Sequence, residues 1–133
     1  MGVAVGSQET GLATPLEVIA RAADDKNVWR RLREMVRVEQ ATRIIVGDPV
    51  NMDGSAGDQA LAVRAFARRL KGALRQVRVE MFDERLSSFS ADEWMARDGL
   101  RPADRRRRRD AYAAAVILLD YFASEHPSQA RNP

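Results

Sequence analysis

Two adjacent carboxylates and an arginine stand at a position where α/β proteins place their chemistry. Asp83 and Glu84 directly follow the alternating stretch 76–82, which predicts a strand, and Arg85 comes next. Ligands in open α/β sheets gather at the carboxyl ends of strands. Such a trio can hold a divalent cation and a phosphate together. It is also typical of a solvated turn between a strand and a helix, and the spacing leaves both interpretations open.

Asp110 is a second candidate because of its two neighbours in sequence. Five consecutive arginines at 105–109 precede it, and an apolar stretch at 111–119 follows it. A carboxylate at the start of a buried helical segment, flanked by phosphate-binding arginines, suits Mg²⁺ or Mn²⁺, which prefer carboxylate oxygens. The alternative is a boundary charge that pairs with a neighbouring arginine.

Asp48 and the loop after it form a third region of interest. Asp48 ends the β-branched run 43–47, but an Asp before a Pro is also the usual start of a turn. The loop 51–57, which begins with Asn51, can cradle a phosphate with backbone N–H groups at the start of the next helix. It has neither the Lys nor the spacing of a P-loop.

The composition excludes several classes of site. The 133 residues include no Cys, and the one His, His126, lies in a polar tail, so we expect no disulfide, no thiolate zinc site and no Ser-His-Asp triad. The longest apolar run is too short for a membrane span, which needs about 20 residues. No basic region of a secretory signal precedes the first apolar residues. We therefore expect a cytoplasmic protein that does not bind membranes.

The basic residues favour a nucleic-acid partner. All but Lys26 and Lys71 of the 22 basic residues are Arg, and residues 64–133 carry a net charge of +5 against −2 for residues 1–63. A GC-rich genome accounts for part of the Arg excess but not for its clustering. Arginine binds phosphate as a planar fork, and a run without interleaved aromatics suits phosphate contacts. The expected contacts are Arg105, Arg106, Arg108 and Arg109.

The pattern of apolar residues predicts an α/β protein. Strands are expected at 2–5, 14–20, 43–47 and 76–82. Helices are expected from the Asp24 region to Glu39, at 56–74, at 87–97 with Ser90 or Ser88 as the cap, and from about 102 to 123. This order mixes hairpin and crossover connections. We expect one domain over 1–123 and a polar tail at 124–133.

Three motifs resemble the YqgF family of RuvX-like, or Holliday-junction-resolvase-like, proteins. They are the stretch 45–54 (IVGDPVNMDG), the stretch 83–88 (DERLSS), and Asp110 followed by 113–119 (AAAVILL). They occur in the family's order and spacing, and the opening 2–5 (GVAV) resembles its second strand. The resemblance extends from residue 1 to about residue 123.

The resemblance implies an RNase H-like fold, a five-stranded mixed sheet flanked by helices. It implies metal-dependent phosphodiester cleavage that matures the 5′ end of 16S rRNA, or action on branched DNA. Glu84, Asp110 and Asp83 would be the catalytic carboxylates, with Glu84 and Asp110 holding Mg²⁺ or Mn²⁺. Arg85 and the arginine run would hold the nucleic-acid backbone. A four-way junction is two-fold symmetric, so action on it would suit a homodimer.

The sequence also departs from the family pattern. Members carry a strand of the pattern Asp-x-Gly-x-x-Arg just before Gly-Val-Ala, and its Asp is the first metal ligand. Here Met1 immediately precedes Gly2, so we expect this central strand and its Asp to be missing from the chain. The family usually has an apolar residue at Asp48. The alternative function is therefore a non-catalytic RNA-binding module, or a truncated inactive form.

Overall fold

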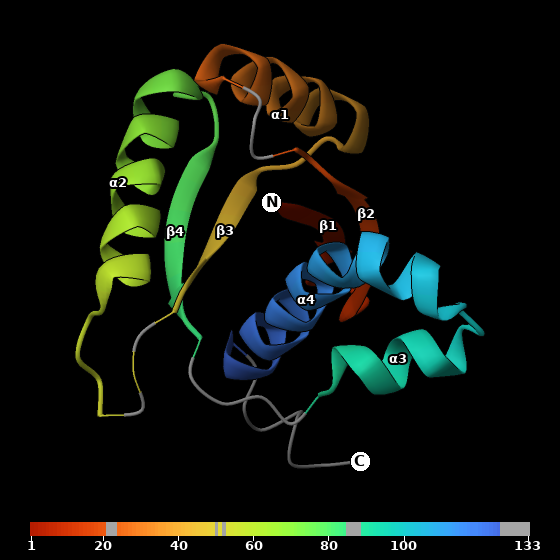
Figure 1. Cartoon of the computed structure of the whole chain (residues 1–133). Helices are drawn as coiled ribbons and strands as arrows, with labels where there is room; N and C mark the ends of the chain where they lie inside the picture. The colour runs from red at the N-terminus through yellow and green to blue at the C-terminus, as the bar shows by residue number, and fades with distance from the viewer. Residues whose placement is uncertain (21–23, 50, 52, 85–88, 126–133) are drawn as a thin grey trace. The chain divides into compact units, whose positions relative to one another are not determined.

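The described residues form four strands and four helices, which divide into two compact units (Figure 1). The computed structural model describes residues 1–133 except 21–23, 50, 52, 85–88 and 126–133. The first unit, here called the hairpin unit, comprises Met1–Ala20 and Ser87–Pro133. The second, the parallel unit, comprises Arg21–Leu86. The predicted α/β class is confirmed, whereas a single domain over 1–123 stays a prediction.

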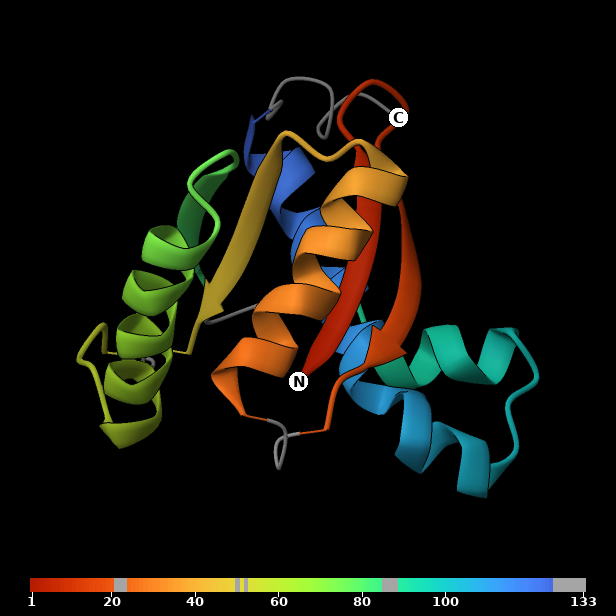
Figure 2. The ribbon, with the colours of Figure 1, turned by 90° about the horizontal axis from the view of Figure 1, so that it is seen from above.

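The hairpin unit begins with two antiparallel strands, β1 (Gly2–Ser7) and β2 (Leu12–Val18). Their pairing runs from Gly2 opposite Val18 to Ser7 opposite Leu12. Gly11, at φ +70°, closes the turn in a left-handed conformation that glycine adopts without steric cost. Figure 2 shows the two strands side by side.

The long helix α4 (Pro102–Glu125) packs against both strands of this hairpin. Its inward residues include Ala111 and Ala115, both fully buried. Gly2 permits a close approach, because a Cβ added there would lie 1.9 Å from the backbone oxygen of Asp110. Gly6 is similarly constrained, with a Cβ position 2.9 Å from the ring of Phe122. The hairpin therefore meets the backbone of α4 at Gly2 and an aromatic ring of α4 at Gly6.

The short helix α3 (Ala91–Arg97) leads into α4. The Ser90 side chain caps it by accepting a hydrogen bond from the Glu93 N–H. Ser90 is one of the two caps that the sequence predicts for this helix. The fully buried Met95 and an edge-to-face contact between Trp94 and Tyr112 join α3 to α4. The helix begins at Ala91 rather than at residue 87, since the cap at Ser90 sets its start.

The parallel unit contains β3 (Arg43–Asp48), β4 (Arg78–Asp83) and the covering helix α2 (Asp58–Ala73). The two strands pair in parallel, as the β-branched run of β3 predicts. Every residue of β3 is nevertheless only half-buried, because among the described strands it has β4 as its single neighbour. Helix α2 starts two residues later than predicted, with Gly57 as its N-cap.

Helix α1 (Asp25–Glu39) completes the parallel unit. Asp24 caps it by accepting a hydrogen bond from the Asn27 N–H. Its apolar residues Val28, Leu32 and Met35, which recur three or four positions apart, are buried on one face. Trp29 contacts Phe66 of α2 with ring centroids 5.3 Å apart, so an aromatic pair connects the two helices.

The described strands form two two-stranded sheets in place of the single mixed sheet predicted from the sequence. No described strand pairs with both β1 and β3. A single sheet needs such a strand, because only a shared strand joins two hydrogen-bonded pairs. None of the helices in the described part of the chain is long and apolar enough to cross a membrane.

Candidate active site

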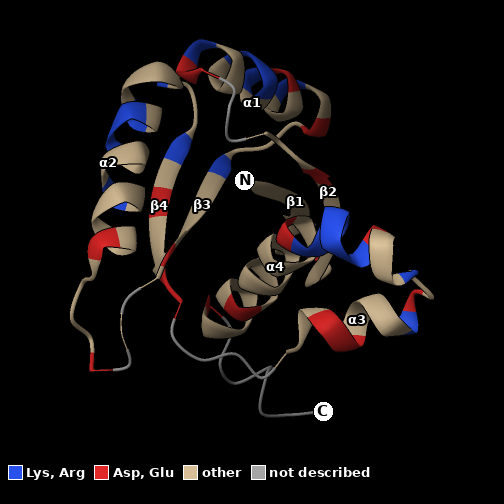
Figure 3. Cartoon of the chain, in the orientation of Figure 1, with Lys and Arg blue, Asp and Glu red and all other residues tan. Residues whose placement is uncertain are grey.

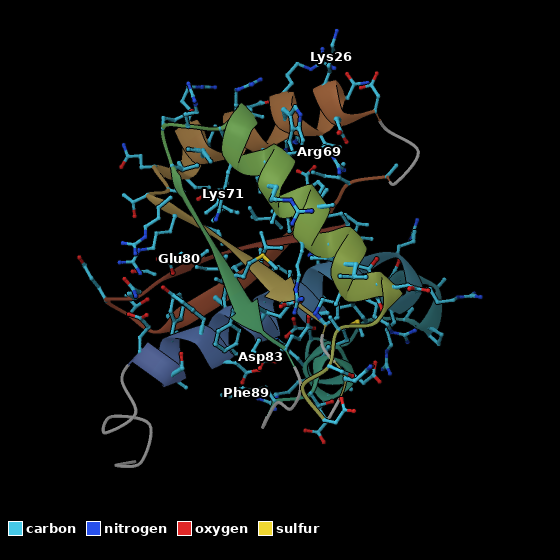
Figure 4. The ribbon with its side chains drawn as sticks, turned by 90° about the vertical axis from the view of Figure 1, so that its left-hand side faces the viewer. Lys26, Arg69, Lys71, Glu80, Asp83 and Phe89 are labelled. Carbon is cyan, nitrogen blue, oxygen red and sulfur yellow. The ribbon has the colours of Figure 1, made fainter. Side chains whose placement is uncertain are left out.

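The carboxyl ends of β3 and β4 bring acidic residues together in the parallel unit. Asp48 and Asp83 are the last residues of their strands and stand opposite each other in the register. The Glu84 N–H donates to the Asp48 carbonyl oxygen over 3.0 Å, which holds Glu84 at the same edge. The side chains of Asp83 and Glu84 are exposed. Figure 3 shows acidic residues at this end of the strands and Figure 4 shows Asp83 there.

A bidentate ion pair between Asp48 and Arg64 occupies the same edge. Arg64 Nε lies 3.2 and 3.1 Å from the two carboxylate oxygens of Asp48, and its Nη2 lies 2.9 Å from Oδ2. Arg64 belongs to α2, two turns into the helix that covers the strands. The Asp48 side chain is 14% exposed and that of Arg64 is 36% exposed. The pair thus joins helix to strand while its cation still reaches solvent.

The electrostatics of this edge favour the charged state of the arginine. The hydrogen bonds to Asp48 raise the pKa of the Arg64 guanidinium above its ordinary value. Partial desolvation opposes this rise in pKa, whereas the negative charges of Asp48 and Asp83 add to it. A fixed positive charge therefore stands among the carboxylates of the strand ends.

The loop between β3 and α2 folds back on itself. The Asn51 N–H donates to the Ser55 carbonyl over 2.9 Å, and the Gly54 N–H donates to the Asn51 carbonyl over 2.8 Å. The Asp53 side chain accepts from both the N–H and the hydroxyl of Ser55. Several backbone donors of this predicted phosphate cradle are thus used inside the loop, although the exposed Asn51 side chain stays at its surface.

Asp110 lies in the hairpin unit, on α4 where the helix meets β1. Its side chain is exposed, and its backbone carbonyl is the group that abuts Gly2. Asp110 and Glu84 belong to different units, so their sharing of one metal ion stays a prediction.

Most of the arginine run makes contacts inside the hairpin unit. Arg105 Nε donates to the Leu100 carbonyl and Arg108 Nη1 donates to the Leu16 carbonyl, each over 2.9 Å. Arg107 pairs with Asp104, and Arg109 lies 3.6 Å from Asp92. Arg106 is exposed on α4. The four arginines predicted to contact nucleic acid are therefore not equivalent, because Arg105 and Arg108 also contribute to the packing of the unit.

Tyr112 connects the run to helix α3. Its hydroxyl donates to Asp98 Oδ2 over 2.6 Å, and the Arg108 guanidinium lies 5.8 Å from its ring centroid. Burial raises the pKa of the Tyr112 phenol above its ordinary value, and the Asp98 carboxylate raises it further. Arg108 has the opposite, weaker effect on that pKa. The phenol is therefore held in its neutral, donating form.

The carboxylates at the strand ends are ligands that hard cations prefer, but few of them lie close together. Asp83 and Glu84 offer exposed oxygen donors of the kind that Mg²⁺ and Mn²⁺ bind. Within the described part of the chain, no three His, Cys, Asp or Glu side chains gather closely enough to hold an ion. Asp48 is neutralised by Arg64 and is a poor third ligand.

The remaining sequence predictions for the site have different outcomes. Arg85 lies outside the described residues. The sequence places Arg64 on the outward face of its helix, with Arg68 and Arg69 as an alternative nucleic-acid-binding face, but does not predict its ion pair with Asp48. A signal existed, because a carboxylate that ends a half-buried strand needs a cation nearby, and Arg64 lies on the helix that returns over that strand.

Comparison with known proteins gives similarity over nearly the whole chain. A family model described as "RuvX: Holliday junction resolvase" matches residues 1–124. A relative named "Putative pre-16S rRNA nuclease" from Anaeromyxobacter dehalogenans strain 2CP-C is 41% identical, covering 96% of this chain and 98% of the relative. Relatives with the same name from Chloroflexus aurantiacus and Opitutus terrae are each 35% identical, covering 85% and 90% of their lengths.

These similarities define the class of the protein as a nuclease, a hydrolase of phosphodiester bonds. More specifically, the chain belongs to the RuvX family, whose model it matches over residues 1–124. The resemblance inferred from the three sequence motifs is thereby confirmed.

Proposed function

We propose that this protein is a metal-dependent endonuclease that processes the 5′ end of pre-16S rRNA in the cytoplasm. The observation that carries the proposal is the pair of exposed carboxylates at the carboxyl end of β4, in a chain that matches the RuvX model over residues 1–124. The names of its relatives supply the substrate class. Branched DNA is a second substrate, on which the protein would act as a homodimer matching the junction's symmetry.

The proposed roles follow from the chemistry of the side chains. Glu84 and Asp110 hold Mg²⁺ or Mn²⁺, and Asp83 assists as a neighbouring carboxylate. A bound ion supplies positive charge beside the scissile phosphate and lowers the pKa of water. Arg85 and the exposed Arg106 hold the nucleic-acid backbone, together with Asn51 and the arginines Arg105, Arg108 and Arg109. Such contacts position the backbone without reading its sequence.

Cleavage of a precursor RNA tests the proposal. The substrate is a transcript spanning the 5′ end of 16S rRNA, incubated with Mg²⁺, Mn²⁺ or EDTA. We expect cleavage with either ion, none with EDTA, and a loss of at least about a hundredfold in Glu84→Gln and Asp110→Asn. Asp104→Asn, which changes another carboxylate of α4, one that is partly exposed and paired with Arg107, serves as the control.

The competing function is that of a non-catalytic RNA-binding module. RNA binding by the wild-type protein without cleavage under any metal condition would contradict the nuclease proposal and favour the binding module. Cleavage of a four-way DNA junction but not of the RNA would contradict the rRNA role and retain the phosphodiesterase.

A further inference from the structure

We propose that Arg64 contacts a backbone phosphate of the RNA at the carboxyl end of β3 and β4, with Asp48 fixing the direction of its guanidinium. This inference rests on the proposed function and deepens it, since it adds a positioning residue that the sequence motifs do not include. The ligand is one phosphodiester group of a single-stranded RNA.

The geometry of the Asp48 pair leaves part of the guanidinium for a second partner. The bonds to Asp48 use Nε and Nη2, while the two N–H groups of Nη1 belong to the other edge of the planar fork. The Asp48 carboxylate is mostly covered, but Arg64 is 36% exposed. A guanidinium held by a carboxylate on one edge loses little entropy when the other edge binds a phosphate.

The position of Arg64 is the second argument. It stands among the strand ends where Asp83 and Glu84 are exposed, close enough for the charge of Asp83 to act on it. A polyanion approaching two carboxylates is repelled unless a cation stands beside them. Arg64 provides this cation, and it belongs to the same unit as Asp83 and Glu84.

Other arginines of the parallel unit face different partners. Arg69, also on α2, bonds Asp25 over 2.8 Å and lies over the ring of Phe66. Arg33 donates to the carbonyl of Ala73 over 3.0 Å. These contacts join α1 to α2. In Figure 4, Arg69 and Lys71 lie toward the end of α2 that is remote from Asp83.

A salt titration of RNA binding tests the inference. The probe is a fluorescein-labelled single-stranded RNA spanning the 5′ end of 16S rRNA, with EDTA present so that no cleavage occurs. Loss of one phosphate contact reduces the slope of log K against log salt by about 0.7 on a single strand. We expect this reduction in Arg64→Gln and a restored slope in Arg64→Lys, which keeps the charge. The matched control is Arg69→Gln, another Asp-paired arginine of α2, which should keep the wild-type slope.

A double variant separates the contact from stability and net charge. Asp48→Asn with Arg64→Gln replaces the ion pair by two amides that can still hydrogen-bond, and it leaves the net charge unchanged. It should fold even if Arg64→Gln alone does not, and its slope should also fall by about 0.7. A wild-type slope in this double variant, or an equal loss in Arg69→Gln, overturns the inference.

The two proposals fail in different ways. Cleavage by the wild-type protein together with an unchanged slope in the double variant overturns the role of Arg64 and leaves the nuclease standing. A reduced slope in a protein that cleaves no RNA supports the role of Arg64 and contradicts the nuclease.

Discussion

At the scale of single residues, charged side chains of one type have different roles in this protein. In the parallel unit, Asp83 and Glu84 stand exposed at a strand end while Asp48 is held by Arg64. In the hairpin unit, Arg105 and Arg108 donate to backbone carbonyls. A charged residue type alone therefore does not identify a ligand contact, because the same guanidinium can join elements of the fold.

Tyr112 provides a prediction that depends on pH. Tyr112→Phe removes the hydrogen bond to Asp98 and should lower the free energy of unfolding by about 1 kcal/mol at neutral pH. The raised pKa of the phenol means that folding favours its protonated form. Its contribution is complete below the ordinary pKa of about 10 and is lost as the pH rises through the higher folded value. Urea unfolding of both proteins between pH 7 and 11 measures this difference, and a gap that widened above pH 10 would refute the account.

The sequence predicts one part of the site and not the other. The strand end with Asp83 and Glu84 was predictable, because alternation located the strand and the carboxylates follow it directly. The Asp48–Arg64 pair was not, since it depends on how α2 lies over β3. A period of 3.6 residues indicates the buried face of a helix but not which strand end a long side chain reaches.

At the scale of elements, the contact of β1 with α4 sets a strict steric limit. Gly2→Ala would place a methyl group 1.9 Å from the Asp110 carbonyl oxygen and should destabilise the protein by about 3 kcal/mol. Gly72→Ala, in α2 with nothing within 4 Å of the new methyl, should instead stabilise by about 0.5–1 kcal/mol. Thermal melting of the two variants checks the opposite signs. Equal melting temperatures would contradict the packing of β1 on α4.

The arginine run lies in the first turns of α4. We expect its members to differ in their effects on RNA binding and on stability. Arg106→Gln with Arg109→Gln changes two exposed arginines and should lower the salt slope of RNA binding by about 1.4, without preference among sequences. Arg105→Gln with Arg108→Gln removes two hydrogen bonds to backbone carbonyls and should lower the melting temperature as well. Salt titrations and melting curves of both double variants measure these effects. An unchanged slope in the variant of Arg106 and Arg109 would show that these two arginines do not contact the RNA.

Most element boundaries were predictable from caps and periodicity. Ser90 and Asp24 cap α3 and α1, and the apolar positions of α1 are buried. The start of α2 was predicted two residues early, since Ala56 and Gly57 carry no capping side chain to mark it. The pairing of strands into two sheets was not predictable, because pairing depends on neighbours far away in sequence.

At the scale of the whole molecule, the described strands pair two by two, β1 with β2 and β3 with β4. The family model matches residues 1–124, which include both pairs of strands.

The central proposal is that Glu84 and Asp110 hold the same metal ion. The most direct measurement is a Mn²⁺ titration followed by the electron paramagnetic resonance signal of free Mn²⁺, with Asp104→Asn as the control. Glu84→Gln and Asp110→Asn should each weaken Mn²⁺ binding at least about tenfold, and the double variant should weaken it little further, because either change already disrupts one shared site. If Asp110→Asn binds Mn²⁺ as tightly as the wild-type protein while Glu84→Gln does not, the two carboxylates do not share an ion and the account is contradicted.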